Sequence, residues 1–450
     1  MMLFKRSTVL PLVLILLCIS LFSCMPKPVE VAPETDTRWQ GKEEFELPES
    51  NGELDTRYEG YKTTLPLAFS ETEESYAFEY EDVDGGVAIK KYIGEDNIVK
   101  IPAEIEGKAV ISVMQNAFAE TSVRALYIPD SVTVIEKGAL SSMKALVTLR
   151  VPFIGGADAD HFGYFFGCSS YDEHAIKIPV GLDVLIIGGG REIADNAFAG
   201  CKSLSAVVLP QSIEKIGSFA FYECADLVYV ETGDNIKSIG SYAFGYCSSL
   251  RRLDCRNAEE LGLGMLYEAK GLFSIRIPFV GGSASENTHI GYIFGADIPD
   301  HNDEYVPHSL RYVEISGNTD IPNRAFAGCA YLEEVVLADG IGKIGIRAFY
   351  ACRSLKSINM PTELKTIEAD AFFACESLET LSFDQKIEKI GMQAFFACKA
   401  LNNLNIPDSV KEIGNCAFAD CSALSSVTVG SGTTLGKDVF LNTPYAKGSE

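Results

Sequence analysis

The sequence has little positive charge for its length. Its 450 residues include 38 Lys and Arg against 62 Asp and Glu, which gives a formal net charge of -24. Nucleic acids and anionic lipid surfaces are bound through clusters of Lys and Arg. Since the sequence contains no such cluster, we expect neither as a partner. The acidity is equally what keeps an exported protein soluble, so it identifies no partner by itself.

The sequence also lacks the motifs of common metal and catalytic sites. It has no His-Glu-x-x-His, no Cys-x-x-Cys and no Asp-x-Asp-x-Asp-Gly run, and these are spacings that hold zinc and calcium. The three glycines at 188–190 are not followed by Lys, which indicates a turn and not a phosphate-binding loop. We therefore expect no enzyme activity, no metal and no other cofactor.

Only one long apolar run is present, and it lies at the N-terminus. Lys5 and Arg6 precede an apolar stretch over residues 8–23, which is short for a membrane span of ~20 residues and has the order of a secretory signal. Its end, Leu-Phe-Ser-Cys, resembles a bacterial lipobox. We expect residues 1–24 to be a lipoprotein signal, with Cys24 lipidated as the only membrane attachment. A signal anchor is the alternative.

Two further segments precede the main body. Residues 25–54 are rich in Pro and Glu and poor in aliphatic side chains, so they cannot bury a core and predict a disordered tether. Residues 55–113 predict an N-terminal β cap, which would cover the apolar face of the first coil. Within it, Asp84, Gly85 and Gly86 separate two runs of strand-forming residues, as in a β-hairpin.

Residues 114–445 repeat one unit, Ile-Gly-x-x-Ala-Phe-x-x-Cys-x-x-Leu-x-x-Leu-x-Ile-Pro. Its Phe, or a substitute, recurs at intervals of 22 to 33 residues, most often 23. A fixed period of this length is typical of leucine-rich repeats. We predict an α/β repeat solenoid, in which right-handed coils align one strand each into a continuous parallel β-sheet. Short irregular or helical segments should lie opposite that sheet, and the Phe side chains should stack inside.

Most cysteines occupy one position of the repeat. Cys201, Cys224 and Cys247 are each 23 residues apart, and the same spacing runs from Cys329 to Cys421. Coils ~4.8 Å apart would stack these side chains as a ladder, in a geometry that rarely suits a disulfide. We expect buried free thiols that act as small apolar side chains. Disulfides, which are usual in exported proteins, are the alternative.

The outward positions of the predicted sheet vary between coils, whereas the inward positions are nearly constant. Such polar, variable positions are typical of an interaction surface and equally of any solvated sheet face. The candidate partner-binding residues are Tyr229, Glu231, Arg251, Arg252, Glu333, Glu334, Lys356, Asn402, Asn403 and Asn405.

Two coils, near 151–190 and 277–318, are longer than the others and resemble each other, as if a block of about 126 residues had been duplicated. Insertions in solenoids leave the stack as loops, often on the binding face. All five histidines lie in or beside these loops, together with several acids: His161, His174, His289, His301 and His308. Exposed loop polarity is the main interpretation, with a calcium site or a hydrolase using His289 as alternatives.

The repeat resembles the BspA-like, treponemal-type leucine-rich-repeat family, as in Ile390-Gly391 followed by Ala394-Phe395, Cys398 and Leu401. The resemblance covers residues 75 to 445. It implies a cell-surface protein that binds extracellular-matrix, host or neighbouring-cell proteins, with no catalytic residue. The leading hypothesis is an adhesin-like lipoprotein of the bacterial outer membrane, monomeric and exposed at the cell surface. A periplasm-facing scaffold of the envelope is the second hypothesis, and a hydrolase the third.

Overall fold

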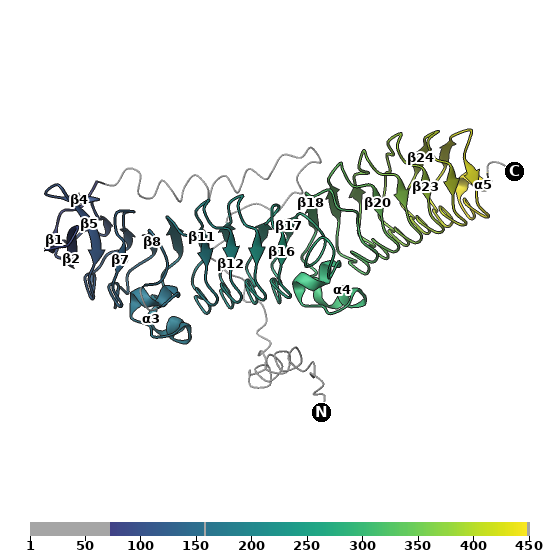
Figure 1. The fold of residues 1–450 in the computed structure, drawn as a ribbon. Coiled ribbons are helices and arrows are strands. Elements are labelled where there is room, and N and C mark those ends of the chain that lie inside the picture. The colour runs from purple at the N-terminus through teal and green to yellow at the C-terminus, as the bar shows by residue number, and fades with distance from the viewer. Residues whose placement is uncertain (1–72, 157–158, 448–450) are drawn as a thin grey trace, which may run out of the picture. The chain divides into compact units, whose positions relative to one another are not determined.

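The computed structural model describes residues 73–156 and 159–447. The predicted signal segment 1–24, Cys24, the tether 25–54 and residues 55–72 of the cap lie outside the described residues. The described part is a solenoid of stacked coils (Figure 1). The leucine-rich-repeat prediction is confirmed, although the coils hold less helix than the α/β expectation implied, because the corners between strands are mostly turns.

Most regular coils contribute a first strand, which is formed by the Leu-x-x-Leu-x-Ile part of the repeat; the coil of Phe372 has no strand over residues 378–383. In β24 (Asn403–Ile406) the side chains alternate between exposed and buried, with Leu404 and Ile406 inside. These strands pair in parallel and in register with the next coil, as Leu404 does with Val427 of β26 (Ser426–Val429). Alternation of this kind is expected of a sheet with one face on the core and one in solvent.

The predicted continuous sheet is interrupted twice. Its first sheet orders β3 (Ile98–Lys100), β6 (Ala125–Tyr127), β8 (Thr148–Val151), β9 (Val184–Ile187), β11 (Ala206–Val208) and β13 (Tyr229–Glu231). A second holds β15 (Arg252–Asp254), β17 (Ser274–Ile277), β18 (Tyr312–Ile315), β19 (Glu334–Leu337) and β21 (Ser357–Ile358), and a third only β24 and β26. Beside β21, the Asn359 side chain bonds both the N–H and the C=O of Leu337, at 2.7 and 2.8 Å. The amide thus takes the place of backbone pairing where the second sheet ends.

A second strand of two residues follows in most coils and ends before the repeat's Gly. One row of these strands comprises β10 (Glu192–Ile193), β12 (Lys215–Ile216), β14 (Ser238–Ile239) and β16 (Glu260–Leu261). The other comprises β20 (Lys343–Ile344), β22 (Thr366–Ile367), β23 (Lys389–Ile390), β25 (Glu412–Ile413) and β27 (Thr434–Leu435). The first residue of each strand is exposed or half-buried, and the apolar residue that follows is buried in every coil but that of β27.

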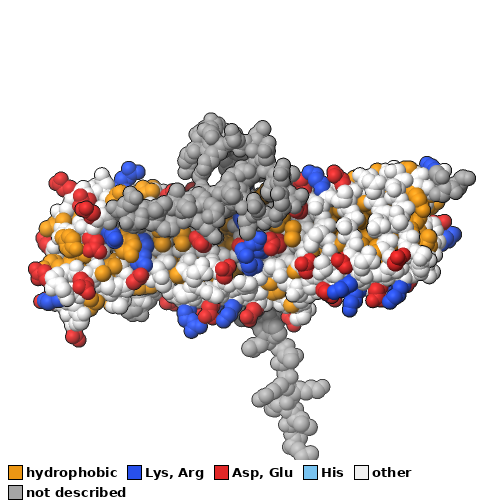
Figure 2. Space-filling view, turned by 90° about the horizontal axis from the view of Figure 1, so that it is seen from above, with side chains coloured by type: hydrophobic (Ala, Val, Ile, Leu, Met, Phe, Trp, Pro, Cys, Tyr) orange, Lys and Arg blue, Asp and Glu red, His pale blue; other side chains and the backbone are white. Residues whose placement is uncertain are grey.

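Charged side chains pair between neighbouring coils along these rows. Glu214 lies 2.7 Å from Arg191 of the preceding coil and 3.0 Å from Lys237 of the following coil. Acidic and basic side chains are accordingly interspersed along the visible edges of the solenoid in Figure 2. Exposed pairs of this kind contribute ~0–1 kcal/mol each, so their main effect is to favour the correct register between coils.

The core is a spine of phenylalanine rings, one for each regular coil. Phe349, Phe372, Phe395 and Phe418 are fully buried, and successive ring centroids lie 4.9 to 5.2 Å apart with nearly parallel planes. At the N-terminal end, Tyr92 stacks on Phe118 at 5.8 Å. Tyr92 belongs to the antiparallel hairpin of β1 (Phe78–Val83) and β2 (Gly86–Tyr92), which pairs with β5 (Lys108–Val113) and covers the first coil. The antiparallel strand β4 (Glu104–Ile105) and the parallel strand β7 (Val134–Ile135) complete the pairing of β5.

The repeat's Gly lies where the backbones of neighbouring coils approach each other closely. A Cβ built on Gly414 would lie 2.4 Å from the backbone nitrogen of Met392 in the preceding coil, and one on Gly391 would lie 2.6 Å from that of Ala369. Neither residue has a positive φ. Glycine is needed at these positions because adjacent backbones approach too closely for a side chain.

The cysteine ladder consists of free, buried thiols. Cys375 donates to the carbonyl of Phe349 at 3.2 Å, and Cys421 to that of Phe395 at 3.2 Å, so each thiol satisfies an acceptor in the preceding coil. Burial raises the pKa of the Cys421 thiol to about 12. The thiolate, which is the reactive form, is therefore strongly disfavoured.

We expect iodoacetamide at pH 7.5 to modify Cys416 alone among the cysteines that the structure describes. Cys416 is half-exposed, and the other ten are buried. Peptide mapping by mass spectrometry after labelling under native conditions measures this directly, and labelling in guanidinium chloride is the control in which all of them react. Native labelling of Cys375 or Cys398 would contradict the buried ladder.

Candidate functional site

The predicted sheet-face residues lie on all three sheets and do not form one cluster. Glu231 lies on β13 of the first sheet, Glu334 on β19 of the second and Asn405 on β24 of the third. Arg251, Lys356 and the three asparagines are exposed, whereas Arg252, Glu231, Glu333 and Glu334 are half-buried. The candidate residues are therefore spread over the coils from that of β13 to that of β24.

Several of these polar side chains bind each other. Glu333 lies 2.9 Å from Arg311 of the preceding coil and 2.7 Å from Lys356 of the following coil. Asn403 donates to Asn402 at 2.7 Å. Because these groups already have partners, a ligand would have to displace those interactions, which reduces the gain from binding.

Tyr229 differs from what its outward position predicted. Its side chain is only 6% exposed, and its hydroxyl donates to Glu231 at 3.3 Å. A large aromatic side chain can lie flat along the strands, beside a small neighbour such as Ala206 in the adjacent strand. Tyr229 therefore offers little surface to a partner.

The two long coils leave the stack at the same edge of the solenoid (Figure 1). The first protrusion, residues 162–180, contains η2 (Phe162–Phe166), η3 (Tyr171–Glu173) and α3 (His174–Lys177). The second protrusion, residues 290–308, contains η4 (Ile290–Phe294), η5 (Pro299–His301) and α4 (Asn302–Tyr305). Each begins where a regular coil would place its Ala-Phe pair, since Phe165 and Phe294 are buried in the spine region.

Both protrusions expose large apolar side chains. In the first, Ile176 is 82% exposed and Val180 is 87% exposed, with Tyr171 at 42%. In the second, Ile298 and Tyr305 are 44% and 39% exposed. Scattered single apolar residues are normal on a surface, but a group of them on two projecting segments is typical of an interaction site.

A cluster of five half-exposed aromatic rings occupies the coil corners between the two protrusions. We call it the aromatic row, comprising Phe219, Tyr222, Tyr242, Tyr246 and Tyr267. Phe219 stacks on Tyr242 at 5.3 Å, and Tyr246 contacts Tyr267 edge-on at 5.5 Å. The row reaches the second protrusion, since Tyr267 and Tyr305 both flank Gly295. The protrusions and the aromatic row together form what we call the corner face.

Three members of the aromatic row adopt a backbone conformation that aromatic residues disfavour. Phe219 has φ 57°, Tyr242 has φ 55° and Tyr246 has φ 59°. Left-handed backbone at a bulky residue costs of order 1–2 kcal/mol. Other coils adopt the same conformation at these positions, for example at Asn196 and Gly200, so the strain belongs to the repeat. The row was not predicted from the sequence, although aromatic residues beside the Ala-Phe pairs indicate it.

The histidines of the long coils are mostly structural. His174 and His289 are 1% and 3% exposed, and each is hydrogen-bonded within its own protrusion. Burial lowers the pKa of both. His301 is more exposed, and its hydrogen bond with Asp297 at 2.8 Å raises its pKa. A buried imidazole such as His289 cannot reach a substrate, so the geometry offers no support for the hydrolase hypothesis.

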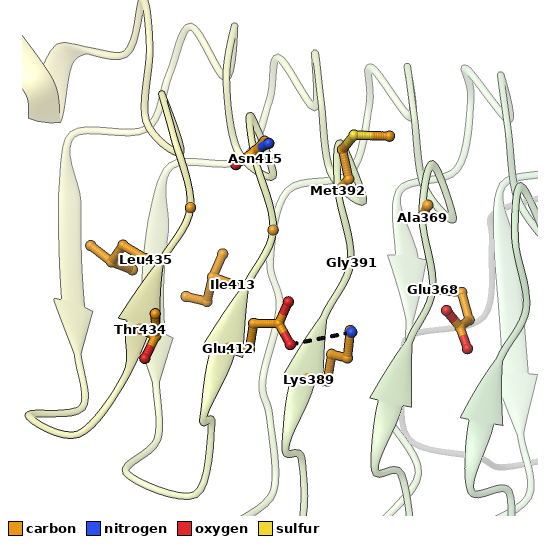
Figure 3. Close-up of a pocket in the computed structure, with 12 residues that line it drawn as sticks. Glu368, Ala369, Lys389, Gly391, Met392, Glu412, Ile413, Asn415, Thr434 and Leu435 are labelled. Atoms are coloured by element: carbon orange, nitrogen blue, oxygen red, sulfur yellow. Dashed lines mark ion pairs between the residues drawn. The ribbon is translucent and has the colours of Figure 1, made fainter.

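A shallow groove of about 440 Å³ crosses the second strands of the C-terminal coils (Figure 3). Glycines such as Gly391 and Gly414 line it, and an ion pair joins Lys389 to Glu412 at 3.2 Å. No His or Cys lines it. Within residues 73–156 and 159–447, no group of three or more His, Cys, Asp or Glu is arranged to hold a metal ion. No helix in that same part of the chain is long and apolar enough to cross a membrane.

Comparison with known proteins gives a family match. A model of the BspA type leucine rich repeat region matches residues 99–179, 184–288 and 319–447, in six copies. A leucine rich cell surface protein of Faecalibacterium prausnitzii is 23% identical over 81% of this chain and 96% of its own, with a TM-score of 0.33. A leucine-rich repeat protein of Bacteroides ovatus is 19% identical over 83% of this chain and 92% of its own, also with a TM-score of 0.33. No curated protein matches the sequence.

Proposed function

Because this chain belongs to the BspA-type leucine-rich-repeat family, we propose that it is an adhesin-like, protein-binding lipoprotein of the bacterial cell surface. In this proposal Cys24 carries the lipid in the outer membrane, and the solenoid binds host, matrix or neighbouring-cell proteins. The observation that carries the proposal is the corner face, where exposed apolar side chains of both protrusions flank the aromatic row.

A protein partner suits the corner face better than a small molecule does. The face projects from the solenoid, while small ligands are bound in concave pockets that bury most of their surface. Aromatic side chains are enriched at the centres of protein interfaces, where they supply most of the binding energy. Tyr246 and Tyr267 combine a large apolar ring with a hydroxyl that suits such a position. The exposed sheet residues Arg251 and Asn405 are proposed as secondary contacts.

We expect at least one protein from a panel of extracellular-matrix proteins to bind saturably to intact cells that display the chain. The double variant Ile176→Asp and Val180→Asp should weaken that binding at least about tenfold, because it places two charges where apolar contact is needed. The matched control is Met392→Asp. Met392 is 49% exposed and lies in a coil C-terminal to both protrusions and to the aromatic row, so this variant should bind like the wild type.

Protease shaving before the assay tests the location at the same time. A surface protein is cleaved and binding is lost, whereas a periplasm-facing scaffold is protected. Equal binding by all variants would contradict the assignment of the corner face, and absence of binding to every panel member would contradict the adhesin-like function.

A further inference from the structure

The two protrusions are held by equivalent hydrogen bonds made with different chemistry. In the first, His161 Nδ1 lies 3.0 Å from His174 Nε2, and the N–H of Gly163 donates to that same Nε2 at 3.2 Å. In the second, His289 Nδ1 lies 3.1 Å from Asn302 Oδ1, and the N–H of Gly291 donates to that oxygen at 2.9 Å. Asn302 thus occupies the place of His174.

The hydrogen bonds fix the tautomer of His174. A backbone N–H can only donate, so Nε2 must be unprotonated and the proton must lie on Nδ1. That proton is donated to the carbonyl of Ala199 in the following coil, at 2.8 Å. Nε2 accepts a second bond from His161 Nδ1, which leaves His161 Nε2 as a buried atom without a partner.

A proton added at His174 Nε2 would break this arrangement, because the new N–H would face the two donors that share Nε2 as their acceptor. A proton added at His161 Nε2 would leave the Nδ1 donor in place, but it would create a cation in a side chain that is only 8% exposed, on an atom that has no hydrogen-bond partner. In the second protrusion an amide oxygen takes the place of His174 Nε2 and is not protonated, so only one of the two bonded groups, His289, can titrate there.

We propose that the His161–His174 pair is an acid-sensitive latch that frees the first protrusion from the solenoid when the surroundings are acidified. The freed segment would carry Tyr171 and Ile176, so the latch would regulate the corner face, a consequence that rests on the proposed function. The second protrusion would stay attached through Asn302.

The environment of the pair is consistent with such a latch. Burial lowers the pKa of His174 from 6.5 to about 4 and also lowers that of His161. The neutral pair therefore contributes stability above pH 6.5 that is lost as the pH falls through 4. Several titratable groups face the pair. Lys137 lowers the pKa of His161, whereas Asp160 and Glu173 raise it, and Asp172 raises the pKa of His174. The thiols Cys168 and Cys201 also lie beside the pair.

Hydrogen exchange of the full chain in detergent tests the latch without any partner. Between pH 7 and pH 4.5, corrected for intrinsic rates, amides in 163–178 should lose at least about tenfold protection, while those in 291–306 should lose less, because the bond there contains one buried imidazole instead of two. His174→Asn, which installs the residue of the second protrusion, should reduce the pH response of the first to that of the second. Asn302→His should raise the response of the second to that of the first.

An equal pH response of the two protrusions in the wild type would overturn the latch. So would a His174→Asn variant that keeps the full pH response of the wild type, or an Asn302→His variant whose second protrusion responds no more than in the wild type. If His174→Asn failed to fold, the comparison of the two protrusions in the wild type and the Asn302→His variant would still decide. If the protrusions showed no difference in pH response but partner binding were intact, only the latch would be refuted. If the pH response were present but no partner bound, only the proposed function would be refuted.

Discussion

Replacing Phe395 by alanine is expected to lower the free energy of unfolding by about 3–5 kcal/mol. The ring is fully buried and stacks between Phe372 at 4.9 Å and Phe418 at 5.2 Å. Because each coil contacts mainly its two neighbours, the cavity would weaken two interfaces at once. Urea denaturation followed by far-UV circular dichroism measures the loss, and hydrogen exchange should place it in the coils of Phe372 to Phe418.

The adjacent residue provides the matched control. Phe396 is half-exposed and stacks on Phe373 alone, at 4.9 Å. Phe396→Ala should therefore cost only about 1 kcal/mol. If the two variants lost the same stability, the spine would not be the main source of cohesion between coils.

Adding a single methyl group at Gly414 is expected to destabilise the solenoid by about 2 kcal/mol, and the larger Val by more. The alanine Cβ would lie 2.4 Å from the nitrogen of Met392 and 2.7 Å from the carbonyl carbon of Gly391. Two backbones would have to separate, which stretches the hydrogen bond of 2.8 Å from Gly414 N–H to the Ile390 carbonyl. Thermal unfolding of Gly414→Ala measures the effect.

Gly432 is the control for the cost or benefit of alanine as such. A Cβ there meets nothing within 4 Å, so Gly432→Ala should be neutral or slightly stabilising. Glu136 and Glu368 stand at the position of Gly414 in their coils, and there the equivalent hydrogen bonds from the N–H to the carbonyls of Val113 and Ile344 are 2.9 and 3.0 Å long. The stack therefore accepts a side chain at these places by a small expansion. A Gly414→Ala variant as stable as the wild type would show that this expansion has no cost.

The period of the sequence predicted the coil, because buried residues such as Leu401 and Phe395 must recur at the same position of each repeat in order to pack against their equivalents in the next coil. The period could not predict the backbone distances and hydrogen bonds between neighbouring coils. The need for Gly391 arises from the distance to Ala369 in another coil, and the residues beside Gly391 in the sequence do not indicate that distance. The interruption at β21 depends likewise on the Asn359 side chain reaching into the preceding coil.

The candidate site was predicted in part. The two long coils were identified from their length, and the structure places their projecting segments at one edge. The aromatic row was missed because its members, such as Tyr222 and Tyr246, hold different positions of the unit and become neighbours only when corners of adjacent coils meet. The alternation of side chains along the strand predicted that Tyr229 points outward and is exposed. An outward side chain can still be buried when its large ring lies flat along the sheet, as that of Tyr229 does.

The hairpin that covers the first coil has a consequence for the order of folding. Among the described residues, β1 and β2 precede every coil, so a chain exported N-terminus first presents its covered end before the coils that follow. Each later coil then meets hydrogen-bond acceptors in the preceding coil: the N–H of Gly414 bonds to the carbonyl of Ile390, and the thiol of Cys421 bonds to the carbonyl of Phe395. Coils can thus add one at a time to the C-terminal end of the stack.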